Sequence, residues 1–181
     1  MRENFKSVSI ATEVQPYIEL MCFEMLRGMI DGIKDRGLTL STAESCTGGL
    51  IGKILTDVPG VSAVYAGGII SYTNEVKISQ LGVSVETIER YTEVSAETAR
   101  EMAEGVRERL STDIGISTTG FAGPDGGNET DPVGTVYIGV ATKEQTKVLR
   151  LSLDGDSDRA AIRRAAAHVA LMAVEKIVLK D

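Results

Sequence analysis

Apolar residues recur with a helical period near both ends of the chain. Between Pro16 and Arg36 they stand three or four residues apart, which predicts an amphipathic helix ended by Gly37. A second stripe of this kind predicts a helix over residues 156–179, with Asp156 or Ser157 as its N-cap. The two stripes consist of Cys22, Leu26, Met29 and Ile33, and of Ile162, Ala166, Val169, Ala173 and Ile177.

Between these helices, strand-like and helix-like patterns follow one another. Runs rich in β-branched residues predict strands at 38–45, 63–73, 113–120, 135–142 and 146–155. Helical spacing predicts shorter helices at 48–58, 74–82, 84–91 and 95–110. The pair Gly67 and Gly68 inside the second run predicts a bulge or a close backbone approach.

The order of these elements predicts an α/β fold with a mixed sheet. Strands that alternate with helices favour parallel pairing, but the last two runs are close enough to form a hairpin. We therefore expect helices on both faces of a sheet that is not purely parallel. With 181 residues, 43% of them hydrophobic, the chain is long enough for one core. We expect residues 1–13 to be a loose lead-in and residues 14–181 to be a single domain.

Composition narrows the classes of partner. The net charge is −7 and is spread along the chain, which disfavours duplex nucleic acid. The longest apolar runs fall short of the roughly 20 residues of a membrane span, and the start lacks a signal-peptide pattern, so we expect a cytoplasmic protein. Two cysteines and one histidine, without metal or disulfide spacing, disfavour a structural zinc site, and we expect neither a metal nor another cofactor.

Two glycine-rich loops follow predicted strands, where α/β proteins bind ligands. They read "ESCTGG" at residues 44–49 and "TTGFAGPDGG" at residues 118–127. Their backbone amides could cradle a phosphate or carboxylate, and plain turn chemistry is an equally good reading. Three arginines at the start of the last helix, Arg159, Arg163 and Arg164, stand where cations are unfavourable unless an anion is nearby.

Ser45 is a candidate nucleophile because it directly follows a predicted strand, with the amides of Cys46 and Thr47 as a candidate oxyanion hole. An N-cap role for Ser45 is the simpler reading, and Cys46 is either a rival nucleophile or an apolar filler. His168 lies in the last helix and is interpreted as structural. Without a histidine, a lysine of lowered pKa is the usual base.

Lys77 is the candidate for that base, with Tyr72 beside it at the end of the second strand. A solvated helix lysine paired with a nearby acid is the alternative.

Five motifs in order resemble the CinA carboxy-terminal domain family, also called PncC, the nicotinamide mononucleotide deamidases. They are "TAESCTGG", "SYTNEVK", "TTGFAGPDGG", "PVGTVYIGVAT" and "GDSDRAAIRR", and they run from about residue 38 into the last helix. The resemblance implies a three-layer α/β/α fold without a metal. It also implies hydrolysis of the carboxamide of nicotinamide mononucleotide to nicotinic acid mononucleotide and ammonia.

Residue by residue, the resemblance implies a nucleophile at Ser45, a lysine at Lys77 and a tyrosine at Tyr72. It implies a substrate-binding threonine at Thr119, and a phosphate-binding arginine at Arg159 or, if the motif is shifted, at Arg163. With the loop amides, the candidate substrate-binding residues are Cys46, Thr47, Gly48, Gly49, Thr119, Gly120, Arg159 and Arg163.

Two other functions remain open. A non-catalytic nucleotide sensor would use the same loops to bind its ligand without releasing ammonia. A structural partner of a larger assembly would leave Ser45 and Lys77 as ordinary capping and surface groups. In each case we expect no nucleic acid and no membrane among the partners, and a symmetric homodimer is a candidate assembly.

Overall fold

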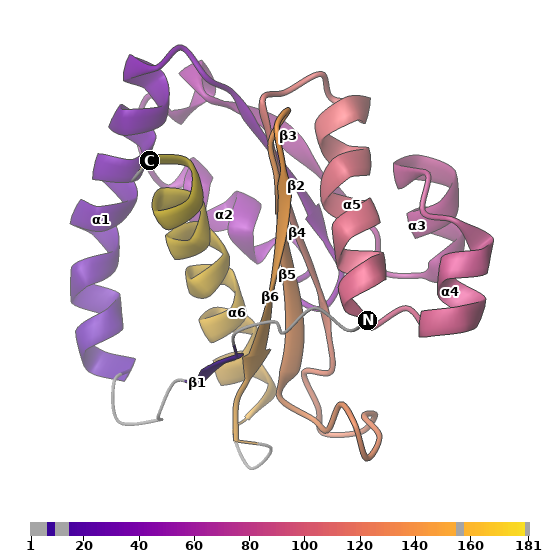
Figure 1. The fold of residues 1–181 in the computed structure, drawn as a ribbon. Helices are drawn as coiled ribbons and strands as arrows, with labels where there is room; N and C mark the ends of the chain where they lie inside the picture. Colours follow the sequence, from indigo (N-terminus) through magenta and orange to yellow (C-terminus); the bar gives the residue numbers. More distant parts are fainter. Residues whose placement is uncertain (1–6, 10–14, 155–157, 180–181) are drawn as a thin grey trace.

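A single mixed sheet forms the centre of the protein (Figure 1). The computed structural model describes residues 7–9, 15–154 and 158–179. The strand order is β1-β6-β5-β4-β2-β3, in which β4 pairs antiparallel with β5, β5 pairs antiparallel with β6, and the other pairs are parallel. The strands are β1 (Ser7–Ser9), β2 (Leu40–Glu44), β3 (Tyr65–Ile70), β4 (Ile114–Gly120), β5 (Thr135–Ala141) and β6 (Thr146–Ser152).

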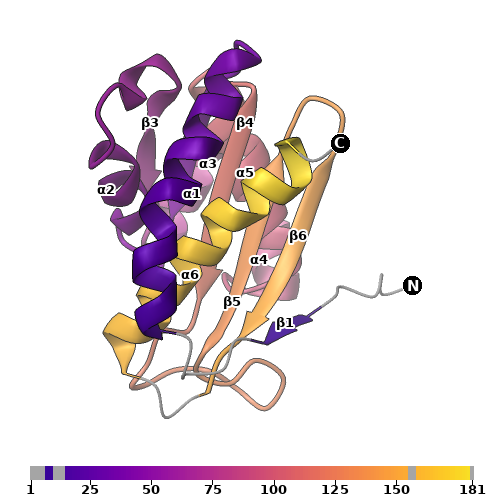
Figure 2. The same ribbon diagram turned by 90° about the vertical axis from the view of Figure 1, so that its left-hand side faces the viewer.

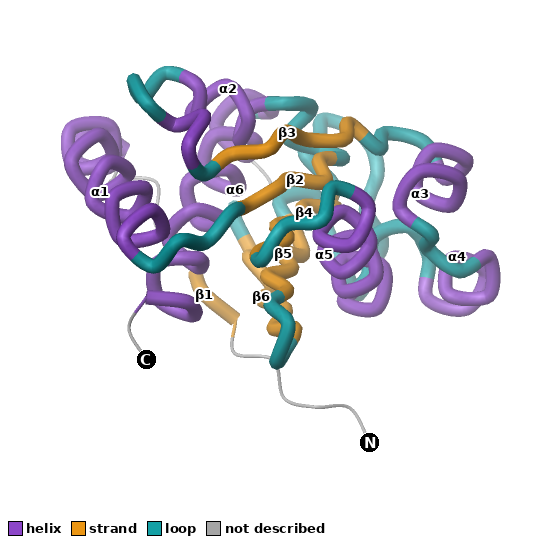
Figure 3. Tube along the Cα trace, turned by 90° about the horizontal axis from the view of Figure 1, so that it is seen from above, coloured by secondary structure: helices purple, strands orange, loops and turns teal. Residues whose placement is uncertain are grey.

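Helices cover both faces of this sheet, so the mixed α/β/α architecture is confirmed (Figures 1 and 3). One layer contains α1 (Gln15–Asp35), α2 (Leu50–Thr56), α6 (Arg159–Val174), the 3₁₀ helix η2 (Val61–Ala63) and the π-helix η3 (Glu175–Leu179). The other contains α3 (Asn74–Leu81), α4 (Val85–Tyr91) and α5 (Ala96–Arg109). Figure 2 shows α1 and α6 together over one face of the sheet.

The main hydrophobic core lies between the sheet and the layer of α1, α2 and α6. Leu26, Met29 and Ile33 of α1 belong to it, as the period of the first helix predicts. A smaller cluster on the opposite face joins Ala43 of β2 to Leu81 of α3 and Met102 of α5. Burial on both faces makes β2 an inner strand of the sheet, at whose end the first glycine-rich loop begins.

The glycine pair in β3 behaves as predicted. The register between β2 and β3 shifts after Leu40, because Leu40 pairs with Tyr65 whereas Ser41 pairs with Gly67. At Gly68, a Cβ atom would lie 2.2 Å from the Thr42 Oγ1, so only glycine permits this close approach. The pair therefore provides both the bulge and the close contact.

Two predictions at the ends of the chain need revision. Residues 7–9 of the expected lead-in form β1, whose three residues are too few for a strand period to be visible. The last helix starts at Arg159, and its N-cap is Asp158, whose Oδ1 accepts a hydrogen bond from the Ala161 amide at 2.7 Å. The predicted caps Asp156 and Ser157 lie outside the described residues. Among the helices that are described, none is long and apolar enough to cross a membrane.

Candidate active site

The candidate active site lies where the parallel strands β2 and β3 end side by side. Glu44 and Ile70 are paired in register, and the Ser71 amide extends the ladder by donating to the Glu44 carbonyl at 2.8 Å. On the other side, the Ser45 amide donates to the Thr118 carbonyl of β4 at 3.0 Å. The backbone of Ser45 is therefore fixed against the adjacent strand at this edge of the sheet.

Lys77 of α3 reaches this edge and contacts Ser45. Its Nζ donates to the Ser45 Oγ at 3.1 Å, to the Ser71 carbonyl at 2.9 Å and to the Tyr72 carbonyl at 3.4 Å. The residue is only 1% exposed, so Lys77 is not the solvated helix lysine of the alternative reading. Burial lowers the pKa of its ammonium, while the negative charge of Glu93 acts in the opposite direction.

Tyr72 reaches the site through its backbone. Its carbonyl accepts from Lys77, whereas its side chain is 59% exposed and its hydroxyl accepts from the Arg159 Nη2 at 3.2 Å. Within the described residues no hydrogen bond joins the Tyr72 hydroxyl to Ser45 or Lys77. The structure thus brings Ser45 and Lys77 into direct contact, whereas the Tyr72 phenol is exposed at the outer edge of the site, beside Arg159.

Glu44 is a residue of this candidate site that the sequence interpretation missed. Its buried carboxylate accepts from the amides of Gly49 and Ile51 at 3.0 Å each and of Gly52 at 2.9 Å, so it occupies the N-terminus of α2. The N-cap position itself is Gly49, not Ser45. An acid immediately before the candidate serine was the available signal, but nothing local shows that it folds back onto the helix.

This arrangement settles which loop amides are already used. The Gly49 amide donates to Glu44 and the Gly48 amide to the Ser45 carbonyl at 3.1 Å, so these two predicted substrate-binding amides already have partners. Across the described ranges, no oxygen atom accepts from the amides of Cys46 and Thr47. Both amides interact with the Cys46 sulfur, which is a weak acceptor, and their role as an oxyanion hole stays a prediction.

Cys46 and Thr47 turn their side chains inward. Burial raises the pKa of the Cys46 thiol to about 12, so a thiolate nucleophile is disfavoured there. The hydroxyls of Thr47 and Thr118 are hydrogen-bonded at 2.8 Å, which ties the loop to β4. Of the two candidate nucleophiles, the contact with Lys77 favours Ser45.

The two candidate arginines have different positions. Arg163 is half-buried and donates from Nε to the Cys46 carbonyl at 3.1 Å and from Nη2 to the Thr47 carbonyl at 2.7 Å. Arg159 is exposed and donates from Nη1 to the Gly123 carbonyl at 2.6 Å, in addition to its contact with Tyr72. Arg163 therefore braces the serine loop from α6, and Arg159 lies at the rim.

The second glycine-rich loop lies at the end of β4. Thr119 is fully buried, and its hydroxyl donates to the Glu93 carbonyl at 2.6 Å. At Gly120, a Cβ atom would lie 2.5 Å from the Thr135 carbonyl oxygen, which explains the need for glycine. Thr119 is thus beside the strand ends, but its hydroxyl already has an acceptor.

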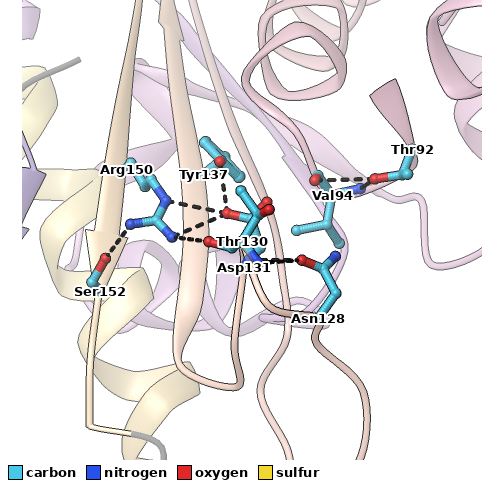
Figure 4. Close-up of polar contacts among 8 residues, drawn as sticks. All are labelled: Thr92, Val94, Asn128, Thr130, Asp131, Tyr137, Arg150 and Ser152. Carbon is cyan, nitrogen blue, oxygen red and sulfur yellow. Dashed lines mark hydrogen bonds and ion pairs between the residues drawn. The ribbon is translucent and has the colours of Figure 1, made fainter. Parts of the chain in front are cut away.

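A polar cluster anchors the far arm of this loop to the sheet (Figure 4). The Asp131 Oδ1 accepts from the Tyr137 hydroxyl at 2.8 Å and from the Arg150 Nε and Nη2 at 3.2 and 3.1 Å. The Asn128 side chain accepts from the amides of Thr130 and Asp131. These contacts fix residues 128–131 to β5 and β6. The same connection between β4 and β5 contains Gly123, whose carbonyl accepts a hydrogen bond from Arg159.

In the parts of the chain that are described, no group of three His, Cys, Asp or Glu residues could hold a metal ion.

A family profile and the most similar curated proteins point to the same protein family. The sequence profile of the CinA C-terminal domain matches residues 24–178. A putative competence-damage inducible protein of Acetivibrio thermocellus is 52% identical over 146 residues, which cover 81% of this chain and 35% of that protein. A CinA-like protein of Fusobacterium nucleatum is 50% identical over 146 residues, again 81% of this chain and 35% of that protein. The chain thus spans about a third of the length of these curated relatives.

Solved structures share the fold. The competence/damage inducible protein CihA of Agrobacterium tumefaciens has a TM-score of 0.82 and 37% identity, covering 87% of this chain and 94% of that one. A CinA superfamily protein of Escherichia coli has a TM-score of 0.83 and 31% identity, covering 96% of both chains. From the profile match, the sequence identities and these structures, we conclude that the chain belongs to the CinA C-terminal domain family.

Proposed function

We propose that the protein hydrolyses the carboxamide of nicotinamide mononucleotide to nicotinic acid mononucleotide and ammonia, with Ser45 as nucleophile and Lys77 as base. The observation that carries the proposal is the 3.1 Å contact between the Ser45 Oγ and the Nζ of a buried lysine. This distance lies within the range that proton transfer requires, and burial favours the neutral amine that a base must be. The substrate itself comes from the resemblance of the five sequence motifs.

The carbonyls around Lys77 orient its lone pair. A neutral amine has two N–H bonds and one lone pair, and the Ser71 and Tyr72 carbonyls accept at 2.9 and 3.4 Å. With both N–H bonds directed at these carbonyls, the lone pair faces the Ser45 hydroxyl. Tyr72 therefore contributes to the proposed base through its backbone.

The reaction begins when Lys77 takes the Ser45 proton and Oγ attacks the carboxamide carbon. The amides of Cys46 and Thr47, which no oxygen atom of the described residues occupies, donate to the oxygen that becomes negative in the tetrahedral intermediate. Lys77 then protonates the leaving nitrogen, ammonia departs, and an ester remains on Ser45. Water hydrolyses this ester and releases the acid.

The two arginines take separate roles in this proposal. Arg159 is exposed at the rim and is the residue proposed to bind the phosphate of the nucleotide. Arg163 already donates to the carbonyls of Cys46 and Thr47, so it holds the oxyanion amides in place rather than meeting the phosphate.

The test is incubation of the protein with nicotinamide mononucleotide while ammonia and nicotinic acid mononucleotide are both quantified. Ser45→Ala and Lys77→Met should each lower turnover by about a thousandfold or more, with substrate binding retained. Ser79→Ala and Lys53→Met change exposed residues of the same types and should leave turnover unchanged.

Normal turnover by Ser45→Ala would remove Ser45 from the role of nucleophile. An intact protein that binds the nucleotide without releasing ammonia would favour the sensor.

A further inference from the structure

Ser71 carries a buried hydroxyl that lacks a partner. The residue is 0% exposed, and within the described part of the chain its Oγ makes no hydrogen bond. Its backbone is fully engaged, since the amide donates to Glu44 and the carbonyl accepts from Lys77. Burying an unpaired hydroxyl costs free energy, so a role in binding a water or a ligand would explain why this hydroxyl is there.

The Ser71 side chain faces the same layer as Ser45 and Lys77. Ala43 of β2 and Ile69 of β3 are paired in register and pack in the same cluster against α3 and α5. Side chains alternate along a strand, so the residues two positions later, Ser45 and Ser71, project toward that same layer. The Ser71 carbonyl already lies 2.9 Å from the Lys77 Nζ.

Neighbouring buried hydroxyls show that this is not a general property of the site. Thr47 and Thr118 are hydrogen-bonded to each other, and Thr119 donates to a carbonyl. Ser41, equally buried in β2, contacts the Thr112 hydroxyl at 2.7 Å and the Val106 carbonyl at 3.3 Å. Two buried hydroxyls of the described residues lack a hydrogen bond, those of Ser71 and Thr135. Ser71 is the one of the two whose own carbonyl contacts the proposed base.

We propose that the Ser71 hydroxyl binds the water that hydrolyses the ester on Ser45. This inference rests on the proposed function. Once Ser45 is esterified, the Lys77 lone pair has lost its hydroxyl partner and accepts one O–H of a water. The Ser71 hydroxyl donates to the oxygen of that water, which leaves its second lone pair free to attack the ester carbon.

The step balances in atoms and charges. The water oxygen bonds to the acyl carbon while its proton moves to the Lys77 Nζ. The bond between the acyl carbon and the Ser45 Oγ then breaks, and Oγ recovers the proton from Nζ. The products are the carboxylic acid and the free serine, with Lys77 neutral again. Attack by Ser45 on the carboxamide needs no water, so Ser71 acts only in the second half of the reaction.

Ser71→Ala tests this division, with Ser41→Ala as the matched control. Ammonia is released with the first half-reaction and the acid with the second, so both are followed over time. Ser71→Ala should show an ammonia burst, a kcat lowered by about tenfold to a hundredfold, and kcat/KM within about threefold of the intact protein. Intact-mass spectrometry should detect the acyl adduct, which a Ser71→Ala/Ser45→Ala protein should lack.

Thermal unfolding gives a readout that is independent of turnover. Ser41→Ala breaks existing hydrogen bonds and should lower Tm, whereas Ser71→Ala removes an unpaired group and should leave Tm unchanged or raise it.

A Ser71→Ala protein with normal kcat and no burst would overturn the inference. So would an equal fall in kcat and kcat/KM without an adduct. The intact protein reports separately on the proposed function, because failure to release ammonia there would overturn both.

Discussion

The buried Glu44 carboxylate allows a quantitative test of how the serine loop is held. It accepts three amide hydrogen bonds, from Gly49, Ile51 and Gly52. In Glu44→Gln one carboxylate oxygen becomes an NH2 group, which cannot accept and directs its own hydrogens at an amide donor. At least one charge-assisted bond is lost, and each such bond contributes about 1.5–3 kcal/mol. For a domain of this size the loss corresponds to a fall in Tm of about 3–12 °C.

Urea unfolding of the intact protein and of Glu44→Gln measures this difference directly. Glu97→Gln, an exposed acid in the first turn of α5, is the matched control and should change the free energy of unfolding by less than about 0.5 kcal/mol. Turnover should also fall in Glu44→Gln, because the same carboxylate sets the path of the chain after Ser45. A Glu44→Gln protein as stable as the control would refute the assignment of Glu44 as the anchor of α2.

The remaining predictions concern the proposed base and the two arginines. Because burial lowers the pKa of Lys77 and only the neutral amine is a base, kcat/KM should rise with pH through a pKa below the ordinary lysine value of 10.5. Glu93→Gln should move this limb to still lower pH, since it removes the carboxylate that raises the lysine pKa; an unchanged limb would contradict this. Arg159→Ala should raise KM for nicotinamide mononucleotide but not for the riboside, which lacks the phosphate, and equal effects on both would argue against phosphate binding. Arg163→Ala should instead lower kcat and cost about 1–3 kcal/mol of stability in urea unfolding, because two loop carbonyls lose their donor.

Local patterns were sufficient for most of the secondary structure. The stripe of Leu26, Met29 and Ile33 identified a helix face, and the closely spaced final strands identified the hairpin and therefore a mixed sheet. Ser45 and Lys77 were recognisable as candidates because one follows a strand and the other lies a helical turn beyond the next strand. These features depend on neighbours within about one turn, which is the range that periodicity and sterics control.

The contacts of the site could not be predicted in the same way. Which carboxylate caps α2, which arginine braces the serine loop and where the Tyr72 phenol points all depend on segments far apart in the chain. Arg163, for example, contacts carbonyls more than a hundred positions earlier. Such contacts form only when strand order has brought those segments to one edge.

By itself, the sequence determined most of the elements, the mixed sheet and the pair of residues proposed to react. Only the tertiary structure decided that Lys77 is buried against Ser45, that Glu44 already occupies the N-terminus of α2 and that Ser71 has an unpaired hydroxyl. The physical reason is that burial and hydrogen-bond pairing are properties of packed surfaces. The order β4-β2-β3 places three strand ends side by side, and a residue's partners there are set by the neighbouring strands rather than by its own position in the chain.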